Sequence, residues 1–403
     1  MQANQVSHLF LRSAIYSGSN SRSLIPNLFH GLGSKKVVLY SDRVLKKIGL
    51  VDMVVELFNS SRKEDWPELV GIYLDIAPDA ESKSVNKAAE FARTVGADSL
   101  LALGGGSVMD TVKGVKYLLH NGLSDIKKVM PRGIVYERLP NARRIDIPHI
   151  AVPTTAGTGS EVSPIAVIYN EDLHVKGNII NPFISADIAI LDPELTTLLP
   201  PKITAFTGFD ALTHAIEALV SPKATSITDA FALQAIRAIE KNLPIVVSNG
   251  EDVDARMEML QASLMSITAF SFALHAIPIH NFAHAYGALF RIPHGLANAV
   301  FLPIVMEKIP NLYLPKVKQL AEALRVNLEH QDEDYTLSLV LEKIRSLQYQ
   351  TGIPKDFKEF NLTEKDLERV RALVTSDPAA VAYPLSNDVI DNVGQAVVPL
   401  SVK

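Results

Sequence analysis

Histidine is concentrated in one short part of this chain. Four of the eleven histidines lie within twenty residues, as His275, His280, His284 and His294. A fifth, His214, follows Asp210 by four residues in TGFDALTHAIEALVS, a run with helical periodicity, so these two side chains share one helix face. Imidazole and carboxylate groups are ligands that Fe²⁺, Zn²⁺, Mn²⁺, Co²⁺ and Ni²⁺ accept. The cluster therefore predicts a divalent metal site.

Spacing alone does not decide which histidines bind the metal. Asp210 with His214 and His280 with His284 are both separated by four residues, so they form the simplest four-ligand hypothesis. His294 stands in Ile-Pro-His-Gly, a turn that leads into a predicted helix. Any one of these histidines is explained more simply as a hydrogen-bonded core residue. The whole set, in a chain without cysteine, favours metal binding.

A glycine-rich loop is the second candidate site. Gly104, Gly105 and Gly106 follow an apolar strand-like run and precede a predicted helix. Glycines let a phosphate approach the backbone, and the N–H groups of a helix start bind anions. We expect Ser107 to cap this helix with Asp110 as its capping-box partner. The loop lacks the GxGxxG pattern, so the ordinary Rossmann fingerprint is absent and a tight, capped turn is the structural alternative.

Two further features favour a dinucleotide site. The run PTTAGTGSEVSP follows another short strand and carries the hydroxyl groups of Thr154, Thr155, Thr158 and Ser160. Two polar loops that follow strands of one parallel sheet line the same edge, where α/β proteins bind nucleotides. Asp42 ends a strand, where a carboxylate binds a ribose 2′-hydroxyl and disfavours a 2′-phosphate, so NAD is expected over NADP. A helix N-cap explains Asp42 equally well.

The elements that must position these residues change along the chain. Strands are predicted within HLFLRSAIYSG and at 35–42, 68–75, 99–104 and 149–152, and helices between them at 45–60, 82–95 and 107–120. This alternation predicts a parallel sheet covered by helices. After Asp192-Pro193 helical periodicity dominates, with helices predicted at 202–219, 226–241, 252–276, 281–289, 294–305 and 314–324. We expect an α/β dinucleotide-binding domain at 1–193 and an all-α metal-binding domain at 194–403.

Composition restricts the partners and the compartment. The chain has 403 residues, 47% hydrophobic and 21% charged, with a net charge of −5, as in a soluble globular enzyme that does not bind nucleic acid. No cysteine is present, which excludes disulfides and thiolate ligands and fits a reducing compartment, so we expect a cytoplasmic protein. The uncharged run 262–279 is borderline for a membrane span, but its polar residues favour a buried helix and no membrane partner.

Four motifs carry a resemblance to a known family. GGGSVMD, PTTAGTGSE, FDALTHAIEALVS and HNFAHAYGALFRIPHGLANA resemble, in order and spacing, the signatures of the iron-containing (group III) alcohol dehydrogenases. The likeness extends over roughly residues 15–373. It implies a Rossmann-like α/β domain, an all-α domain and a dehydroquinate synthase-like architecture, with the metal in the cleft between the domains.

The resemblance also implies roles for single residues. The metal ligands it implies are Asp210, His214, His280 and His294, which replaces the simple pairing by spacing. His284 matches a histidine beside the nicotinamide and substrate, and we expect it to relay a proton. Asp42 matches the acid linked to NAD preference. The expected cofactor-binding residues are Gly104, Gly105, Gly106, Ser107, Asp110, Thr154, Thr155, Thr158 and Lys176.

The implied function is an NAD(H)-linked alcohol dehydrogenase or aldehyde reductase. It moves a hydride between a small primary alcohol or aldehyde and nicotinamide, with the oxygen on Fe²⁺ or Zn²⁺, and the family suggests a homodimer or larger homo-oligomer. Alternatives are a glycerol dehydrogenase, a dehydroquinate synthase-like zinc and NAD enzyme, and a non-catalytic metal- or nucleotide-binding protein. The synthase needs several basic pocket residues for its phosphate, and Arg291 is the main one near the expected ligands.

Some positions depart from the family pattern. Ala285 and Tyr286 stand where relatives often carry Pro-Leu, and Asp79 stands where asparagine is common. Ile165 replaces a polar residue of diol-handling members, and the tail lacks the usual Asn-Pro-Arg. The expected ligand set is complete, so these departures concern the pocket for the substrate.

Overall fold

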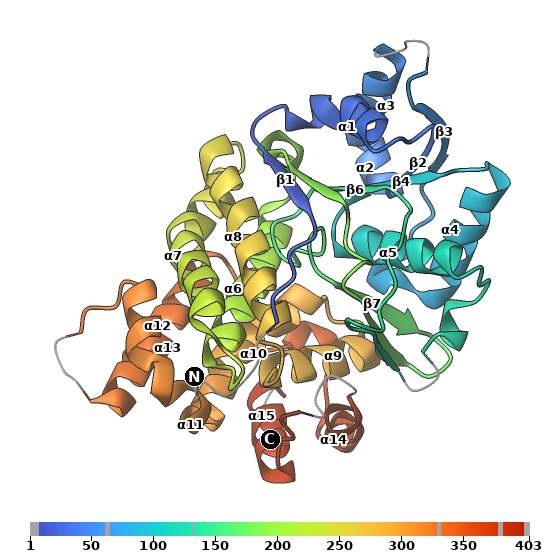
Figure 1. Cartoon of the computed structure of the whole chain (residues 1–403). Helices are drawn as coiled ribbons and strands as arrows, with labels where there is room; N and C mark the ends of the chain where they lie inside the picture. The colour runs from blue at the N-terminus through green and yellow to red at the C-terminus, as the bar shows by residue number, and fades with distance from the viewer. Residues whose placement is uncertain (1–7, 61–64, 131–132, 329–331, 378–381, 399–403) are drawn as a thin grey trace. The chain divides into compact units, whose positions relative to one another are not determined.

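The computed structural model describes residues 8–60, 65–130, 133–328, 332–377 and 382–398 (Figure 1). The chain divides into two compact units, one formed by Phe10–Leu198 and another that begins at Leu199. The first unit contains the strands and the second is helical. The predicted fold class, an α/β unit followed by an all-α unit, is confirmed.

A parallel sheet is the centre of the first unit. In the described part of the chain it has six strands in the order β1-β9-β6-β4-β2-β3. Their bounds are Ala14–Ser17 (β1), Lys36–Tyr40 (β2), Glu68–Tyr73 (β3), Ser99–Gly104 (β4), His149–Pro153 (β6) and Ile188–Leu191 (β9). Every strand expected from sequence appears there, and β9 is an addition to that prediction.

Helices cover both faces of this sheet (Figure 1). Alternate residues along a strand point to opposite faces, so Val37 and Leu39 of β2 pack on one side and Val38 and Tyr40 on the other. One side is covered by α1 (Ile25–Gly31), α2 (Arg43–Lys47) and α3 (Leu50–Ser60). The other is covered by α4 (Ser82–Thr94) and α5 (Gly106–His120). Burial on both faces explains why these strands read as continuous apolar runs.

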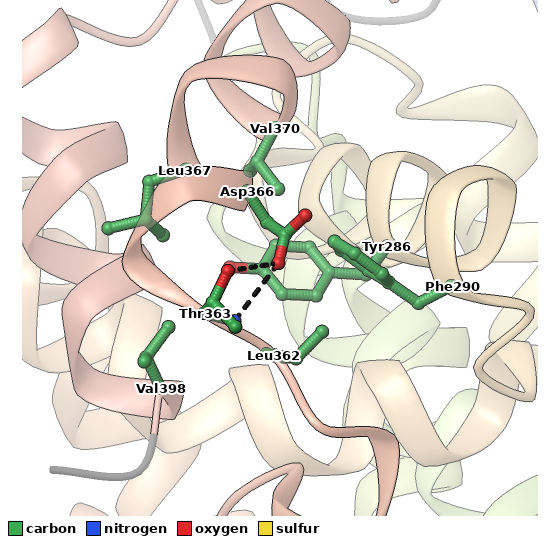
Figure 2. A pocket seen from close by; sticks show the side chains of 8 residues that line it. All are labelled: Tyr286, Phe290, Leu362, Thr363, Asp366, Leu367, Val370 and Val398. Carbon is green, nitrogen blue, oxygen red and sulfur yellow. Dashed lines mark hydrogen bonds between the residues drawn. The ribbon is translucent and has the colours of Figure 1, made fainter. Parts of the chain in front are cut away.

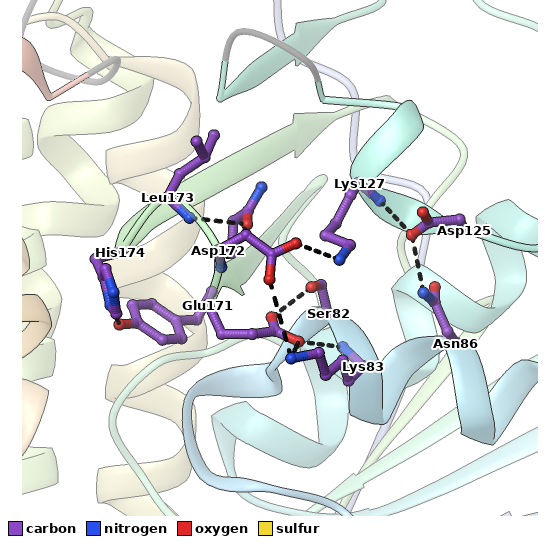
Figure 3. Close-up of polar contacts among 11 residues, drawn as sticks. Ser82, Lys83, Asn86, Asp125, Lys127, Glu171, Asp172, Leu173 and His174 are labelled. Atoms are coloured by element: carbon purple, nitrogen blue, oxygen red, sulfur yellow. Dashed lines mark hydrogen bonds and ion pairs between the residues drawn. The ribbon is translucent and has the colours of Figure 1, made fainter.

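A second, smaller sheet was missed by the sequence analysis. Its strands in the described residues are β5 (Ile134–Tyr136), β8 (Val175–Ile180) and β7 (Ile165–Asn170), in that order, and β7 pairs with β8 antiparallel. The β7–β8 turn is bound to the start of α4, because Glu171 accepts hydrogen bonds from the Ser82 hydroxyl and from Lys83 N at 3.1 Å (Figure 3). This anchor holds β8, which carries Lys176.

The described residues of the second unit form helices. Six of them correspond to predicted helices, whereas those at 310–313, 333–350 and 367–376 were not individually predicted. The helices are α6 (Pro201–Val220), α7 (Ser226–Ser248), α8 (Val253–Phe272), α9 (Pro278–Phe290), α10 (His294–Lys308), α11 (Pro310–Tyr313), α12 (Val317–Ala323), α13 (Glu333–Gln350), α14 (Leu367–Ser376) and α15 (Asn387–Val397). Compared with the expected bounds, α7 extends further, through Pro244 to Ser248, and α8 ends earlier, at Phe272. The C-terminal segment, for which no element was predicted, contains α15.

Helix α6 is the central element of this unit. Nearly all of its residues from Thr204 to Val220 are buried, and it contacts α7, α8 and α10. A helix that is apolar all round is surrounded by other helices, so polar groups on α6 are removed from water. Within the described residues we find no helix with both the length and the apolar character of a membrane span.

Candidate metal centre and cofactor loops

Three helices of the second unit bring metal-ligating side chains together. Asp210 comes from α6, His280 from α9 and His294 from the first position of α10. Among the described residues, one ligand atom from each of these three side chains lies within 4.8 Å of the others. The Asp210 Oδ1 atom is 3.9 Å from His280 Nε2 and 3.5 Å from His294 Nε2. Spacings of this order fit donors arranged around one cation.

His214 of α6, a ligand expected from the resemblance, lies next to His280 but outside the three-donor group of the described residues. Its ring stacks on that of His280, with centroids 4.5 Å apart and an interplanar angle of 26°. Its Nδ1 atom is buried and has no hydrogen-bond partner within the described residues. Burial lowers the pKa of His214 to about 4, so the ring stays in the neutral form that binds metals. A buried, unsatisfied histidine whose ring stacks on one of three converging donors fits a divalent metal site.

Two further buried side chains hold the candidate ligands in place. Glu217 accepts hydrogen bonds from Ile279 N at 2.7 Å and from His280 Nδ1, which leaves Nε2 of His280 as the atom nearer Asp210. Desolvation raises the pKa of Glu217 to about 8, against the lowering effect of the Ile279 N–H. Asn298 Nδ2 donates to Asp210 Oδ1 at 2.6 Å and lies 3.2 Å from His294 Nε2.

Neither Glu217 nor Asn298 was predicted from the sequence, although a signal for both residues exists. Glu217 follows Asp210 by seven residues and Asn298 follows His294 by four, so each lies on the same helix face as a candidate ligand. Orienting groups of this kind fix the tautomer and direction of metal-binding histidines.

His284 lies beside this centre but outside the three-donor group of the described residues. Its ring stacks on His294, with centroids 5.4 Å apart and an angle of 19°. Its Nδ1 atom is 2.9 Å from Asp377 Oδ2. His294 is 23% exposed in its side chain, whereas Asp210 and His280 are 2% and 3% exposed, so the centre is open on the His294 side. An open position is typical of catalytic rather than structural metal sites.

In the first unit the two polar loops lie side by side. Strands β4 and β6 are paired, with Gly104 opposite Pro153, and Thr154 N donates to Gly104 O at 3.0 Å. A Cβ atom at Gly106 would lie 2.8 Å from Thr158 Cγ2, and one at Gly105 would lie 3.3 Å from the Thr155 side chain. The loops therefore meet at the carboxyl edge of the sheet, as predicted, and the glycines permit that contact.

The predicted capping box of Ser107 and Asp110 is wrong. Helix α5 begins at Gly106, and its N-cap, Gly105, makes no side-chain cap. Because the helix starts before Ser107, the serine hydroxyl lies in the first turn and accepts a hydrogen bond from Asp79 N at 3.1 Å. Asp110 accepts hydrogen bonds from the Ser160 hydroxyl at 2.5 Å and from Val167 N at 3.2 Å, so it ties α5 to the hydroxyl-rich loop and to β7.

Two other residues that were expected to contact the cofactor, Asp42 and Lys176, bond to groups of the protein itself. Asp42 is the N-cap of α2, with Oδ1 accepting from Val44 N at 2.8 Å and Leu45 N at 2.9 Å, so the capping alternative is realised. Both of those bonds use one carboxylate oxygen. Lys176 Nζ is 2.9 Å from Oδ1 of Asp79, the residue bonded to Ser107 at the start of α5.

The unusual Tyr286 does not belong to the metal centre. Its ring packs 4.7 Å from that of Phe301, centroid to centroid, and is buried. Figure 2 shows the pocket next to it, which has no room for a water molecule. That pocket is lined by Tyr286, Phe290, Leu362, Thr363, Asp366, Leu367, Val370 and Val398. The exchange of Leu for Tyr at this position is therefore a packing change between α9 and the α14 region.

Known proteins resemble the chain over nearly its whole length. Residues 13–193 match the model for iron-containing alcohol dehydrogenase, and residues 204–389 match the C-terminal model of the Fe-containing alcohol dehydrogenase family. Long-chain-alcohol dehydrogenase 1 of Geobacillus thermodenitrificans is 36% identical over 342 residues, which is 84% of this chain and 82% of that protein.

Two further relatives cover even more of the chain. The NAD-dependent methanol dehydrogenase of Bacillus methanolicus is 30% identical over 381 residues, 94% of this chain and 96% of that protein. The crystal structure of a 1,3-propanediol oxidoreductase matches with a TM-score of 0.88 at 30% identity, over 97% of this chain and 100% of the other. The chain therefore belongs to the iron-containing alcohol dehydrogenases, a family of oxidoreductases that use iron and NAD(H).

Proposed function

We propose that this enzyme interconverts a small primary alcohol and its aldehyde with NAD(H), at a metal held by Asp210, His214, His280 and His294. The observation that carries the proposal is the convergence of Asp210, His280 and His294 from three helices, with the buried His214 ring stacked on that of His280. A divalent metal there supplies Lewis acidity toward the substrate oxygen, and nicotinamide supplies or accepts the hydride.

The side chains around the centre hold the candidate ligands in place and offset only part of the charge of a divalent ion. One carboxylate and neutral imidazoles leave a bound divalent cation with net positive charge, which favours an anionic oxygen. Glu217 and Asn298 hold the ligands in their directions through the hydrogen bonds described above.

The cofactor is proposed to bind at the two polar loops. The N–H groups at the start of α5 and the glycines at 104–106 suit a pyrophosphate, while Thr154, Thr155 and Thr158 offer hydroxyl groups at the same edge. Lys176 adds a positive charge next to the start of α5. Asp42 supports NAD rather than NADP, because its carboxylate, already used by the α2 cap, would oppose a 2′-phosphate.

His284 is proposed to exchange the proton of the substrate hydroxyl. It stacks on His294 at the more exposed side of the centre, and an imidazole exchanges protons near neutral pH. Substituting His284→Ala is expected to lower kcat while the metal content stays unchanged. Full activity in that variant would remove this role.

Assembly and compartment are also proposals. Strand β1 is an edge strand, and its Ile15 and Tyr16 side chains are 42% and 37% exposed, which supports a homodimer or larger homo-oligomer. The cysteine-free composition supports a cytoplasmic location.

Metal analysis of anaerobically purified enzyme, combined with an alcohol and aldehyde screen, tests the proposal. We expect stoichiometric Fe²⁺ or Zn²⁺, and NADH oxidation with short aldehydes that is lost on chelation and restored by the metal. His280→Ala should lose both metal and activity, whereas His275→Ala, in the connection between α8 and α9, should keep both. Absence of bound metal together with no activation by Fe²⁺ or Zn²⁺ would contradict the mechanism.

A further inference from the structure

A buried carboxylate distant in sequence reaches the histidine next to the metal centre. Asp377 follows α14 directly, and its Oδ2 atom lies 2.9 Å from Nδ1 of His284 on α9. Their side chains are 7% and 13% exposed, so the pair is largely shielded from water. The two residues are 93 positions apart in the chain.

We propose that Asp377 is a positioning residue for His284, one that selects the tautomer and fixes the plane of its ring. A carboxylate only accepts hydrogen bonds, so the contact requires the proton of a neutral imidazole to be on Nδ1. The Nε2 atom is then left without a proton and is the one available to take a proton from a hydroxyl group. This inference rests on the proton-exchange role proposed for His284.

A second contact restricts the ring in another direction. His284 stacks nearly parallel on His294, at a centroid distance of 5.4 Å and an angle of 19°. The stack limits the plane of the ring, while the bond from Nδ1 to Asp377 distinguishes the two orientations related by a ring flip. Together the two contacts restrict the His284 ring to one orientation. The hydrogen bond from Asp377 depends on the packing of α14 against α9.

The alternative is that the bond only ties α14 to α9. A tie of that kind would affect stability, but its loss would leave the tautomer of His284 and the kcat of the folded enzyme unchanged. A positioning role predicts that both change. The tautomer and kcat therefore separate these cases, and a double-mutant cycle tests whether Asp377 acts through His284.

The experiment compares Asp377→Ala and Asp377→Asn, each with and without His284→Ala, in enzyme reconstituted with Zn²⁺. Asparagine has nearly the same shape as aspartate, so Asp377→Asn preserves the packing if the alanine variant folds poorly. Asp366→Asn is the matched control, because Asp366 lies at the other end of α14 and bonds to Thr363. We would measure kcat, KM, zinc content and the tautomer of His284 by ¹⁵N NMR, with its signal assigned from its absence in His284→Ala.

We expect Asp377→Ala to lower kcat about 10- to 100-fold, the usual cost of losing a partner that orients a functional histidine, with little change in KM or zinc content. The Nδ1–H tautomer of His284 should no longer be the main form. Adding Asp377→Ala to His284→Ala should lower kcat no further. Unchanged kcat and tautomer in both Asp377 variants would overturn the inference. If His284→Ala is fully active, the proton-exchange role fails, while the tautomer measurement still decides whether Asp377 positions the ring.

Discussion

Two buried carboxylates of α6, Asp210 and Glu217, depend on the groups that lie next to them. Asp210 and Glu217 are 2% and 1% exposed, and a carboxylate removed from water needs donors or a cation close by. Glu217 has N–H donors from Ile279 and His280, and Asp210 has Asn298 and the facing histidines. These two carboxylates of α6 therefore lie against histidines, and the predictions at this scale concern the hydrogen bonds and ion pairs of single side chains.

Glu217→Gln should weaken metal binding by about 10- to 100-fold. Glutamine has one acceptor oxygen for two N–H donors, so either Ile279 N or His280 Nδ1 would face its NH₂ group. Competition with a chelator measures the affinity. Glu258→Gln, on the exposed side of α8, serves as the control and should bind metal like the wild type. Equal affinities in the two variants would show that Glu217 does not orient His280.

Asp79 and Lys176 should affect NADH binding in opposite directions. Asp79→Asn keeps an acceptor for Lys176 and tolerates the φ of 60°, but removes a negative charge beside the start of α5. We expect binding to strengthen by about 0.3–1 kcal/mol, roughly two- to five-fold, and Lys176→Met to weaken it. Fluorescence titration at low and high salt measures both effects. Asp172→Asn, in the β7–β8 turn (Figure 3), should change neither.

At the scale of elements, each candidate site depends on where helices begin. Helix α5 starts at Gly106, next to the hydroxyl-rich loop, and α10 starts at His294, next to Asp210. Moving either start by one residue would turn these side chains to another helix face. At the start of α5 a side chain larger than that of glycine would collide with Thr158, because a Cβ atom at Gly106 would lie 2.8 Å from Thr158 Cγ2.

Gly106→Ala should therefore damage cofactor binding through the loop rather than through the helix. The new Cβ would lie 2.8 Å from Thr158 Cγ2, which must move, at a cost of about 1–3 kcal/mol in stability. NADH affinity and the urea midpoint would both fall. Gly31→Ala, in α1 with no atom within 4 Å of its Cβ position, is the control and should leave NADH affinity unchanged. Wild-type NADH binding by Gly106→Ala would contradict the proposed loop site.

At the scale of the whole molecule, the metal centre joins distant parts of the helical unit. Asp210 and His294 are 84 residues apart in number, yet their ligand atoms lie 3.5 Å apart. An ion bound by α6, α9 and α10 together binds only the folded unit, so it stabilises that unit by mass action. The effect depends on the free metal concentration relative to Kd.

Metal should thus raise the melting temperature of the enzyme. At a free Fe²⁺ or Zn²⁺ concentration about one hundred times Kd, we expect about 2.7 kcal/mol of stabilisation. Differential scanning calorimetry with and without chelator measures the shift. Asp210→Asn should abolish it, whereas His275→Ala should preserve it. An equal shift in the Asp210→Asn protein would mean that the metal acts at another place.

Much of this architecture follows from local sequence. The strands at 36–40, 99–104 and 149–153, and the helices α6 and α10, were predicted because apolar periodicity and helix-start residues act over a few neighbours. The meeting of the two polar loops was also predictable, because parallel neighbouring strands end at one edge. The second, mixed sheet was not, since β5 has three residues and β8 carries Lys176 and Asn178, so their pairing depends on partners outside the local run.

By itself the sequence determined the histidine cluster, the glycine loop, the class of fold and the resemblance to a family. Spacing alone left both His284 and His294 as candidate ligands, and the resemblance implied His294. The tertiary structure groups His294 with Asp210 and His280 in the described residues. It also decided that Asp377 meets His284 and that Ser107 bonds to Asp79 instead of capping α5. The physical reason is the same in each case. Spacing of three or four residues governs contacts within one helix, whereas contacts between helices depend on how their side chains pack.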